Sequence, residues 1–245
     1  MIKKLILQLK IKLFKQVVKV TYYGHSCFGI EIGGKILLFD PFISPNELAH
    51  NIKVDEIGAD FILISHGHED HIADAESIAK RTGAKVIAIW EVCSWLQKKG
   101  VENCHPVNIG GKIKFDFGFV KCVNAVHSSS MPDGSNGGNP MGFVIESNEG
   151  NFYYAGDTAL HYDMKLIGEY RKIDFAFLPI GDNFTMGVDN AIICCEFINC
   201  SDIIGMHYDT FGYIKIDQNT AIKKFSDSGR KLTLMKIGET INKSK

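Results

Sequence analysis

Short runs of apolar residues, each bounded by glycine or other turn residues, recur along most of the chain. Two of these runs, Cys27–Ile32 and Lys35–Phe39, are joined by two glycines, which predicts a β-hairpin, and the segment 17–23 before them predicts another strand. Further apolar runs predict strands at Phe61–Ile64, Val86–Ile89, Ile113–Phe117, Phe119–Ala125, Gly142–Glu146, Phe152–Ala155, Phe175–Leu178, Ile203–Met206 and Leu232–Lys236.

Some segments between these runs have the spacing of amphipathic helices. Ile72, Ala75, Ile78 and Ala79 recur at three- and four-residue intervals, which predicts a helix over Ile72–Thr82. Hairpins mixed with helical connections indicate an α+β fold in which two mixed sheets form two layers with helices outside them. The other predicted helices are Glu91–Lys99, Asn190–Phe197 and Asp217–Phe225.

Composition narrows the class of protein. The 245 residues, 45% of them hydrophobic, are enough to bury one substantial core, and no linker divides them, so we expect a single domain over residues 1–245. The formal net charge of −1 gives no overall electrostatic reason to expect a nucleic-acid partner, although a local basic patch would not appear in that sum. The seven cysteines are odd in number and lack a C-x-x-C motif, which favours buried thiols in the cytoplasm.

The first stretch, residues 1–17, is rich in lysine and contains no acidic residue. Lys10 and Lys12 interrupt its apolar residues and no small-residue cleavage site follows, so a secretory signal is not expected. A basic amphipathic anchor stays open as an alternative, but a basic extension or a lead-in to the first strand is favoured. No later segment is apolar for long enough to span a bilayer.

The sequence "SHGHEDH" follows an apolar run and crowds together side chains that can bind a metal, namely His66, His68, Asp70 and His71. If the run is a buried strand, His66 and His68 project to one side, while Asp70 and His71 lie at the entrance of the helix that follows. A surface loop gains little from three imidazoles that would repel one another when protonated, so the motif favours metal binding. Since a hydrolytic ion needs about four ligands and an open position for water, this crowding suggests two adjacent ions.

Three later residues, His127, Asp157 and His207, stand directly after apolar runs. Each would lie at a strand end, where a loop residue can reach a shared cleft. Considered singly, each is more simply a turn residue or a satisfied polar group. Their repeated position at strand ends indicates further ligands for the same ions.

The segments "SHGHEDH", "AVHSSS", "YAGDT" and "GMHYDTF" resemble the ordered motifs of the metallo-β-lactamase superfamily, and together they span most of the chain. With "TYYGHSCF" and "LPIGDNFTMG", the chain is similar to bacterial metal-dependent hydrolases related to L-ascorbate 6-phosphate lactonase. The resemblance implies an αββα four-layer sandwich with its site at one edge between the sheets. It also implies one ion on His66, His68 and His127, a second on Asp70, His71 and His207, and a bridging Asp157.

The resemblance further implies roles around the ions. Asp40, at the end of "ILLFD", would orient a ligand histidine, although alone it also fits a strand-end turn. At Asp182, where similar proteins tend to have glycine, the chain departs from the family pattern, and this carboxylate would add negative charge near the cleft or cap its own loop. His25, in "YYGHSCF", would polarise a substrate oxygen or protonate a leaving group, so the candidate catalytic residues are His25 and the ligand Asp70.

Two loops are candidates for the pocket walls. Residues 128–139, directly after His127, suit one wall but also fit a plain connection. Phe184, Thr185 and Met186 are candidates for the other wall, with Phe184 and Met186 expected to pack in the interior.

Formal charges indicate the type of substrate. Two divalent ions carry four positive charges, Asp70 and Asp157 return two negative ones, and a bridging hydroxide leaves a charge near +1, which favours a small anionic substrate. The ions would lower the pKa of the bridging water so that hydroxide attacks a phosphoryl or carbonyl centre. No G-x-S-x-G context for a serine nucleophile is present in the sequence.

We therefore expect a cytoplasmic, binuclear metal-dependent hydrolase acting on a small anionic ester, phosphodiester or phosphorylated lactone. Zn²⁺ or Mn²⁺ are the expected ions, and Fe²⁺ or Ni²⁺ also suit histidine and aspartate ligands. The alternatives are a metal-dependent nuclease, for which no inserted basic arm is evident, and a noncatalytic metal-binding scaffold. A homo-oligomer is compatible with the sequence, which names neither the substrate nor the oligomeric state.

Overall fold

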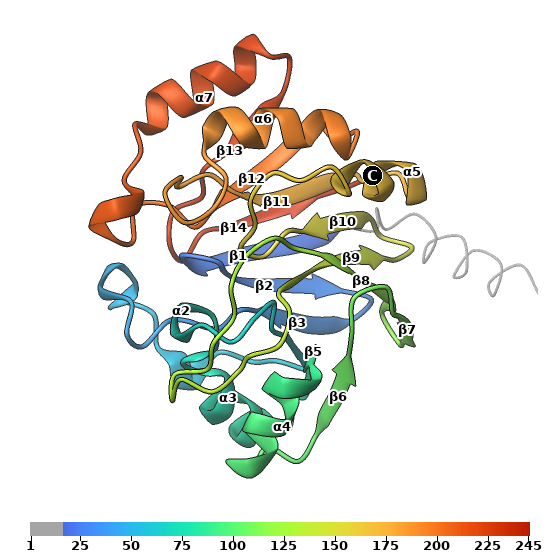
Figure 1. The fold of residues 1–245 in the computed structure, drawn as a ribbon, viewed down its shortest axis with the longest axis vertical. Coiled ribbons are helices and arrows are strands. Elements are labelled where there is room, and N and C mark those ends of the chain that lie inside the picture. The colour runs from blue at the N-terminus through green and yellow to red at the C-terminus, as the bar shows by residue number, and fades with distance from the viewer. Residues whose placement is uncertain (1–16) are drawn as a thin grey trace, which may run out of the picture.

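In the computed structural model, which describes residues 17–245, two seven-stranded sheets pack face to face (Figure 1). The first sheet contains, in spatial order, β14 (Thr240–Lys243), β1 (Val18–Gly24), β2 (Cys27–Ile32), β3 (Lys35–Phe39), β4 (Phe61–Leu63), β5 (Lys85–Ile89) and β6 (Cys104–Val107). The second contains β13 (Lys231–Thr233), β12 (Asp202–Met206), β11 (Phe175–Pro179), β10 (Asn151–Tyr154), β9 (Met141–Glu146), β8 (Gly118–Asn124) and β7 (Lys112–Phe115).

Helices cover the outer face of each sheet, so the predicted αββα sandwich is confirmed (Figure 1). The first sheet carries α2 (Glu69–Ile72), α3 (Ala75–Thr82) and α4 (Trp90–Lys98). The second carries α5 (Met164–Tyr170), α6 (Val188–Phe197) and α7 (Gln218–Asp227). Short 3₁₀ turns lie at Glu47–Ala49, Val54–Glu56 and Gly212–Ile214.

Strand direction explains where the polar residues gather. In the first sheet β3, β4, β5 and β6 are mutually parallel, and in the second β10, β11, β12 and β13 are mutually parallel. Since β8 and β10 are both antiparallel to β9, β8 runs in the same direction as β10. The carboxyl ends of parallel strands meet at one edge of a sheet. Asp40, His127, Asp157 and His207 follow β3, β8, β10 and β12 at such ends.

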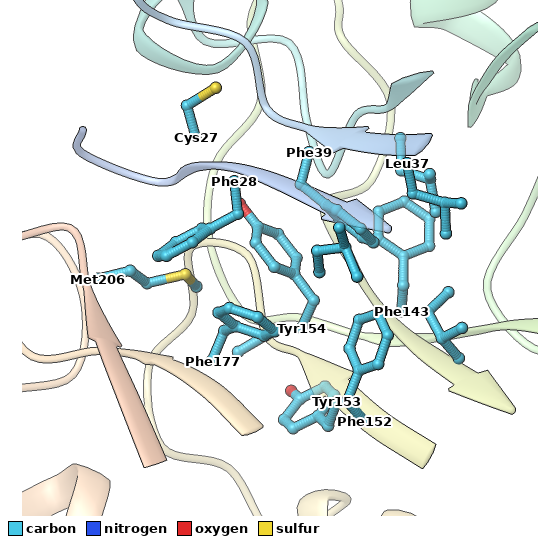
Figure 2. Close-up of a cluster of buried hydrophobic side chains, with 14 of the residues drawn as sticks. Cys27, Phe28, Leu37, Phe39, Phe143, Phe152, Tyr153, Tyr154, Phe177 and Met206 are labelled. Carbon is cyan, nitrogen blue, oxygen red and sulfur yellow. The ribbon is translucent and has the colours of Figure 1, made fainter. Parts of the chain in front are cut away.

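The core between the sheets contains a cluster of aromatic side chains (Figure 2). Phe28 of β2 packs on Phe177 of β11 with ring centroids 4.7 Å apart. Phe39 of β3 packs on Tyr154 of β10 at 4.6 Å. All four rings are fully buried, and such pairs contribute about 0.5–1.5 kcal/mol beyond the burial of their area. These contacts fix the ends of β3 and β10, which carry Asp40 and Asp157.

The predicted single helix over Ile72–Thr82 is wrong, because the chain forms α2 and α3 with a break at Asp74. The Asp74 carboxylate accepts hydrogen bonds from the amides of Ile43 and Ser44 at 2.6 and 2.9 Å. This long-range contact holds Asp74 outside regular helical geometry. The predicted apolar face of the segment is nonetheless buried as expected.

Some elements were not predicted from the sequence. These elements are β6, β14 and α5. The strand predicted at Leu232–Lys236 is present as β13, which is shorter and begins one residue earlier. β6 contains Pro106, which has no backbone donor and is confined to positions such as the edge strand found here. β14 is also an edge strand and has polar residues that lack the expected apolar alternation.

The cysteines are all free thiols, and all except the partly buried Cys104 are buried. The expected buried thiols are therefore largely confirmed. The basic stretch 1–17 lies outside the described residues apart from Val17. Across the part of the chain that the structure describes, none of the helices combines the length and apolar character needed to cross a bilayer.

Candidate metal centre

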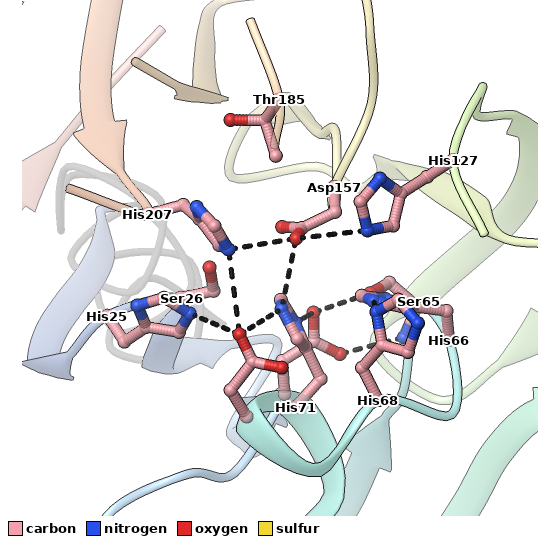
Figure 3. A network of polar contacts seen from close by, with 12 residues as sticks. His25, Ser26, Ser65, His66, His68, His71, His127, Asp157, Thr185 and His207 are labelled. Atoms are coloured by element: carbon pink, nitrogen blue, oxygen red, sulfur yellow. Dashed lines mark hydrogen bonds and ion pairs between the residues drawn. The ribbon is translucent and has the colours of Figure 1, made fainter. Parts of the chain in front are cut away.

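The structure brings the seven predicted ligands together at the edge where the two sheets meet (Figure 3). Asp157 lies at the centre of this cluster. Its Oδ2 atom is 2.9 Å from Nε2 of His207, 3.4 Å from Nε2 of His71 and 3.6 Å from Nε2 of His127. One carboxylate oxygen therefore faces imidazoles from both predicted ligand groups.

The first predicted ligand group consists of His66, His68 and His127, each of which has one ring nitrogen within 4.8 Å of one ring nitrogen of each of the others. Nε2 of His66 is 2.9 Å from Nδ1 of His68. His68 is the residue immediately before α2. The short helix turns the chain back, so that Asp70 and His71 also lie at the cluster.

The second group consists of Asp70, His71 and His207, and His25 joins it. Asp70 Oδ2 lies 3.6 Å from Nε2 of His71, 3.6 Å from Nε2 of His207 and 2.9 Å from Nε2 of His25. Since Asp70 and His71 are adjacent in the first turn of α2, the helix entrance places both at the cluster, as the sequence predicts.

His25 is held by protein groups at both ring nitrogens. Besides the contact with Asp70, its Nδ1 lies 2.9 Å from the Thr210 hydroxyl. Burial lowers the pKa of His25 to about 4, so the ring is neutral at pH 7. An ionised carboxylate only accepts, so Nε2–H donates to Asp70 and Nδ1 accepts from Thr210. This ring is therefore oriented by the protein and has no free nitrogen.

Asp40 is fully buried and contacts one histidine directly and a second through a serine. It accepts from Nδ1 of His71 at 2.8 Å, from the Ser65 amide and hydroxyl at 2.7 Å each, and from the Tyr154 hydroxyl at 2.8 Å. The same Ser65 hydroxyl lies 2.9 Å from Nδ1 of His66. Because both Nδ1 atoms face these acceptors, the Nε2 atoms of His66 and His71 point into the cluster, and each would offer its lone pair to an ion once its ring is deprotonated.

The backbone is strained where several of these side chains are placed. His25, Asp40 and His207 have φ values of 55°, 40° and 55°, a region that residues other than glycine rarely adopt. The His207 amide donates to the His25 carbonyl oxygen at 3.0 Å, which links two of the strained residues. Such strain persists only where the surrounding structure imposes it and gathers at functional sites.

The charges of the cluster are strongly coupled. Burial lowers the pKa of His207, but Asp157 outweighs burial and raises it to about 9. His71 also has a raised pKa, because Asp157, Asp70 and Asp40 outweigh its burial. Burial raises the pKa of both Asp70 and Asp157, but the neighbouring imidazoles hold both well below the ordinary range. The carboxylates are therefore ionised at neutral pH.

The donor set fits divalent ions. Nε2 of His71 and Oδ1 of Asp157 are buried without a hydrogen-bond partner. Ligand bonds of about 2.1 Å place neighbouring ligand atoms about 3.0–3.4 Å apart, close to the 2.9–3.6 Å spacings around Asp157. Imidazole and carboxylate ligands without thiolate suit Zn²⁺, Mn²⁺, Fe²⁺ and Ni²⁺ alike.

The structure also places the remaining predicted residues. Asp182 is exposed, and its carboxylate accepts from the Asn183 amide at 2.9 Å, so its observed contact is within its own loop. Ser128, in the loop 128–139, has its hydroxyl 3.4 Å from Nε2 of His68. Phe184 is 51% exposed, so its predicted packing in the interior is wrong, whereas Met186 is buried as expected.

Sequence reasoning missed Ser65, Tyr154 and Thr210. All three lie inside the quoted motifs, in "SHGHEDH", "YAGDT" and "GMHYDTF", and that membership was an available signal. The motifs alone did not indicate that Tyr154 contacts Asp40 or that Thr210 contacts His25.

Comparisons with known proteins identify the family of the chain. A family model described as "Beta-lactamase superfamily domain" matches residues 35–208. A UPF0173 metal-dependent hydrolase of Flavobacterium johnsoniae is 55% identical over 91% of this chain and 99% of its own length. One from Methylacidiphilum infernorum is 54% identical over the same shares.

A solved structure of a similar protein has the same fold. Igni18, described as a novel metallo hydrolase from the hyperthermophilic archaeon Ignicoccus hospitalis, superposes with a TM-score of 0.83 and is 36% identical, covering 92% of this chain and 98% of its own. A family match over most of the chain, together with relatives more than half identical along nearly their whole length, shows that the chain belongs to the beta-lactamase superfamily, among its metal-dependent hydrolases.

Proposed function

We propose that this hydrolase is binuclear and acts on a small anionic ester, phosphodiester or phosphorylated lactone. The observation that carries the proposal is the position of Asp157 Oδ2 between imidazoles of the two ligand groups. A carboxylate in that position is suited to bridge two ions. His66, His68 and His127 would hold one ion, and Asp70, His71 and His207 the other.

The protein residues supply orientation and charge. Bound ions would supply Lewis acidity, which activates water and stabilises negative charge on the attacked group. Asp40 keeps the Nε2 atoms of His66 and His71 free for ligation by holding both Nδ1 atoms, through Ser65 in the case of His66. His25 donates a hydrogen bond from Nε2 to Oδ2 of Asp70 and so orients this carboxylate.

Charge and exposure support an anionic substrate. Two divalent ions carry four positive charges and the two carboxylate ligands return two, so the centre keeps a positive charge that attracts anions. Within the cluster, the Asp70 side chain is 24% exposed and that of His127 13%, whereas His71 is fully buried. Substrate would therefore approach from the side of Asp70 and His127.

Metal analysis and hydrolysis assays test the proposal together. Protein stripped with chelator and resupplied with Zn²⁺ or Mn²⁺ is expected to bind two ions per chain. It should then hydrolyse bis(p-nitrophenyl) phosphate or members of a lactone panel. His66→Ala should lower the activity by more than about 100-fold, beyond the 10–100-fold typical of an outer-sphere partner.

The matched control is His50→Ala, because His50 is exposed and hydrogen-bonds the Glu47 carbonyl oxygen rather than any predicted ligand. Activity that is indifferent to chelation and to His66→Ala would refute the proposal. Binding of a single ion would refute its binuclear part. A tight, salt-sensitive complex with RNA would favour a nuclease instead.

A further inference from the structure

A hollow of about 560 Å³ opens at the same edge of the sandwich as the metal cluster. Three loops form it: the chain after β3, the loop before α6 and the chain after β12. Figure 1 shows the chain after β3 and the chain after β12 on the same side of the molecule as α2. The residues that line the hollow are Pro45, Asn46, Glu47, Phe184, Thr210, Phe211, Gly212 and Tyr213.

Two lining residues connect the hollow to the metal cluster. The Thr210 hydroxyl lies 2.9 Å from His25, whose opposite nitrogen lies 2.9 Å from Asp70. The Phe211 ring is 5.3 Å from the His25 ring, measured between centroids. Phe184 precedes Thr185, which Figure 3 places beside Asp157 and His207. The hollow therefore adjoins the cluster on the side of His25.

The aromatic side chains that line the hollow are exposed to solvent. Phe184 is 51% exposed, Phe211 37% and Tyr213 79%. The rings of Phe184 and Tyr213 meet edge to face with centroids 6.1 Å apart and planes at 70°. A group of exposed aromatic rings beside a reactive centre is typical of a binding surface, because each ring offers a flat apolar face.

The charge of the lining excludes one kind of ligand. Among the lining residues, all of them in the described part of the chain, there is no lysine or arginine, and the single charged residue is Glu47. A second anionic group on a substrate would lack a partner here and would face Glu47. The lining instead suits an uncharged group that contacts rings.

We infer that this hollow binds the non-reacting part of the substrate, and that this part is an uncharged aromatic or similarly flat apolar group. The inference rests on the proposed function, in which the ions bind the anionic, reacting part. Among the proposed substrate types, it favours aryl esters and aryl phosphodiesters over compounds with a second charged group away from the reacting centre.

Equilibrium binding tests this inference without turnover. Phenylphosphonate and methylphosphonate carry the same anionic group and differ in the group that would enter the hollow. Calorimetric titration of the Zn²⁺- or Mn²⁺-loaded protein should show phenylphosphonate binding about tenfold more tightly. Phe184→Ala and Tyr213→Ala should each remove most of this preference and leave methylphosphonate affinity within about twofold.

Tyr162→Ala is the matched control, because Tyr162 is 71% exposed but does not line the hollow. Equal affinity for the two phosphonates, or a preference that survives both substitutions, would overturn the inference and leave the proposed function intact. Tighter binding of 2-aminoethylphosphonate than of phenylphosphonate would also overturn it, since Glu47 and the rings would then recognise a cation. Failure of every phosphonate to bind would contradict the proposed anion-binding centre. That result would also overturn the inference about the hollow.

Discussion

Nδ1 of His71 lies 2.8 Å from Oδ2 of Asp40, and neither side chain is exposed. This contact connects the end of β3 to α2, which are separated in the chain by two 3₁₀ turns and strand β4. The same carboxylate holds Ser65 and, through Ser65, His66. One buried aspartate therefore orients an imidazole in each proposed ligand group.

Asp40→Asn is expected to weaken metal binding by about 10–100-fold, the range typical of partners that orient a ligand histidine. The amide keeps the size of the side chain but removes its charge and one acceptor, so the Nδ1 proton of His71 is held less firmly. Competition with a chromophoric chelator measures the affinity of the purified variant.

Asp74→Asn is the matched control for that substitution. Asp74 is similarly buried and also accepts two hydrogen bonds, from the amides of Ile43 and Ser44, without touching a proposed ligand. A comparable loss of metal affinity in both variants would show that buried carboxylates act only through general stability.

His25→Gln separates two roles for His25. The hydrogen bonds at both ring nitrogens indicate that His25 positions Asp70, so the substitution should weaken binding of one ion by about 10-fold or more. The sequence-based role, in which His25 acts on the substrate, predicts unchanged metal affinity and a lower kcat. Thr210→Val removes only the hydroxyl that contacts the His25 ring. It should therefore weaken binding of the same ion by a smaller factor than His25→Gln does.

Gly181→Ala should disturb His207 through the backbone. A Cβ atom at Gly181 would overlap the carbonyl oxygen of His207 and lie 2.9 Å from Cβ of Ile214. The expected cost is about 1–3 kcal/mol in the free energy of unfolding, together with weaker metal binding. Urea denaturation and chelator competition measure the two effects. Gly212→Ala, where a Cβ meets nothing within 4 Å, should change neither, and equal effects in both variants would contradict the steric argument.

Much of this arrangement could be predicted from local patterns. Apolar runs separated by turns mark most strands, because a strand buried on both faces needs continuous apolar residues. The histidine motif packs its residues within one strand-to-helix turn, so its geometry is local. A weaker signal, a polar residue directly after an apolar run, predicted the positions of His127, Asp157 and His207. The shared direction of β8, β10 and β12 brings these three residues together.

The rest depends on contacts that local patterns do not contain. The break before α3 comes from Asp74 binding amides some thirty residues earlier in the chain. Tyr154 contacts Asp40 across the two sheets, although its position in an apolar strand indicates only a core residue. The exposed Phe184 was expected inside, because hydrophobicity alone does not distinguish a buried ring from one that lines a hollow.

The stability of metal-free protein should fall between pH 7 and pH 9.5. The pKa of His207 is raised to about 9, since Asp157 outweighs the effect of burial, whereas an unfolded histidine titrates near 6.5. Its contribution to stability is therefore complete below about pH 6.5 and is lost as the pH rises through about 9. Urea midpoints of chelator-treated protein at both pH values measure this loss.

His207→Gln isolates the effect of this imidazole from that of buried thiols. Burial raises the pKa of Cys122 to about 12, so thiols that ionise only on unfolding also destabilise the fold at alkaline pH. The variant keeps the thiols but loses the imidazole, so its midpoint should fall less than that of the wild type over the same interval. An equal fall in both proteins would show that the pair of His207 with Asp157 does not stabilise the metal-free fold.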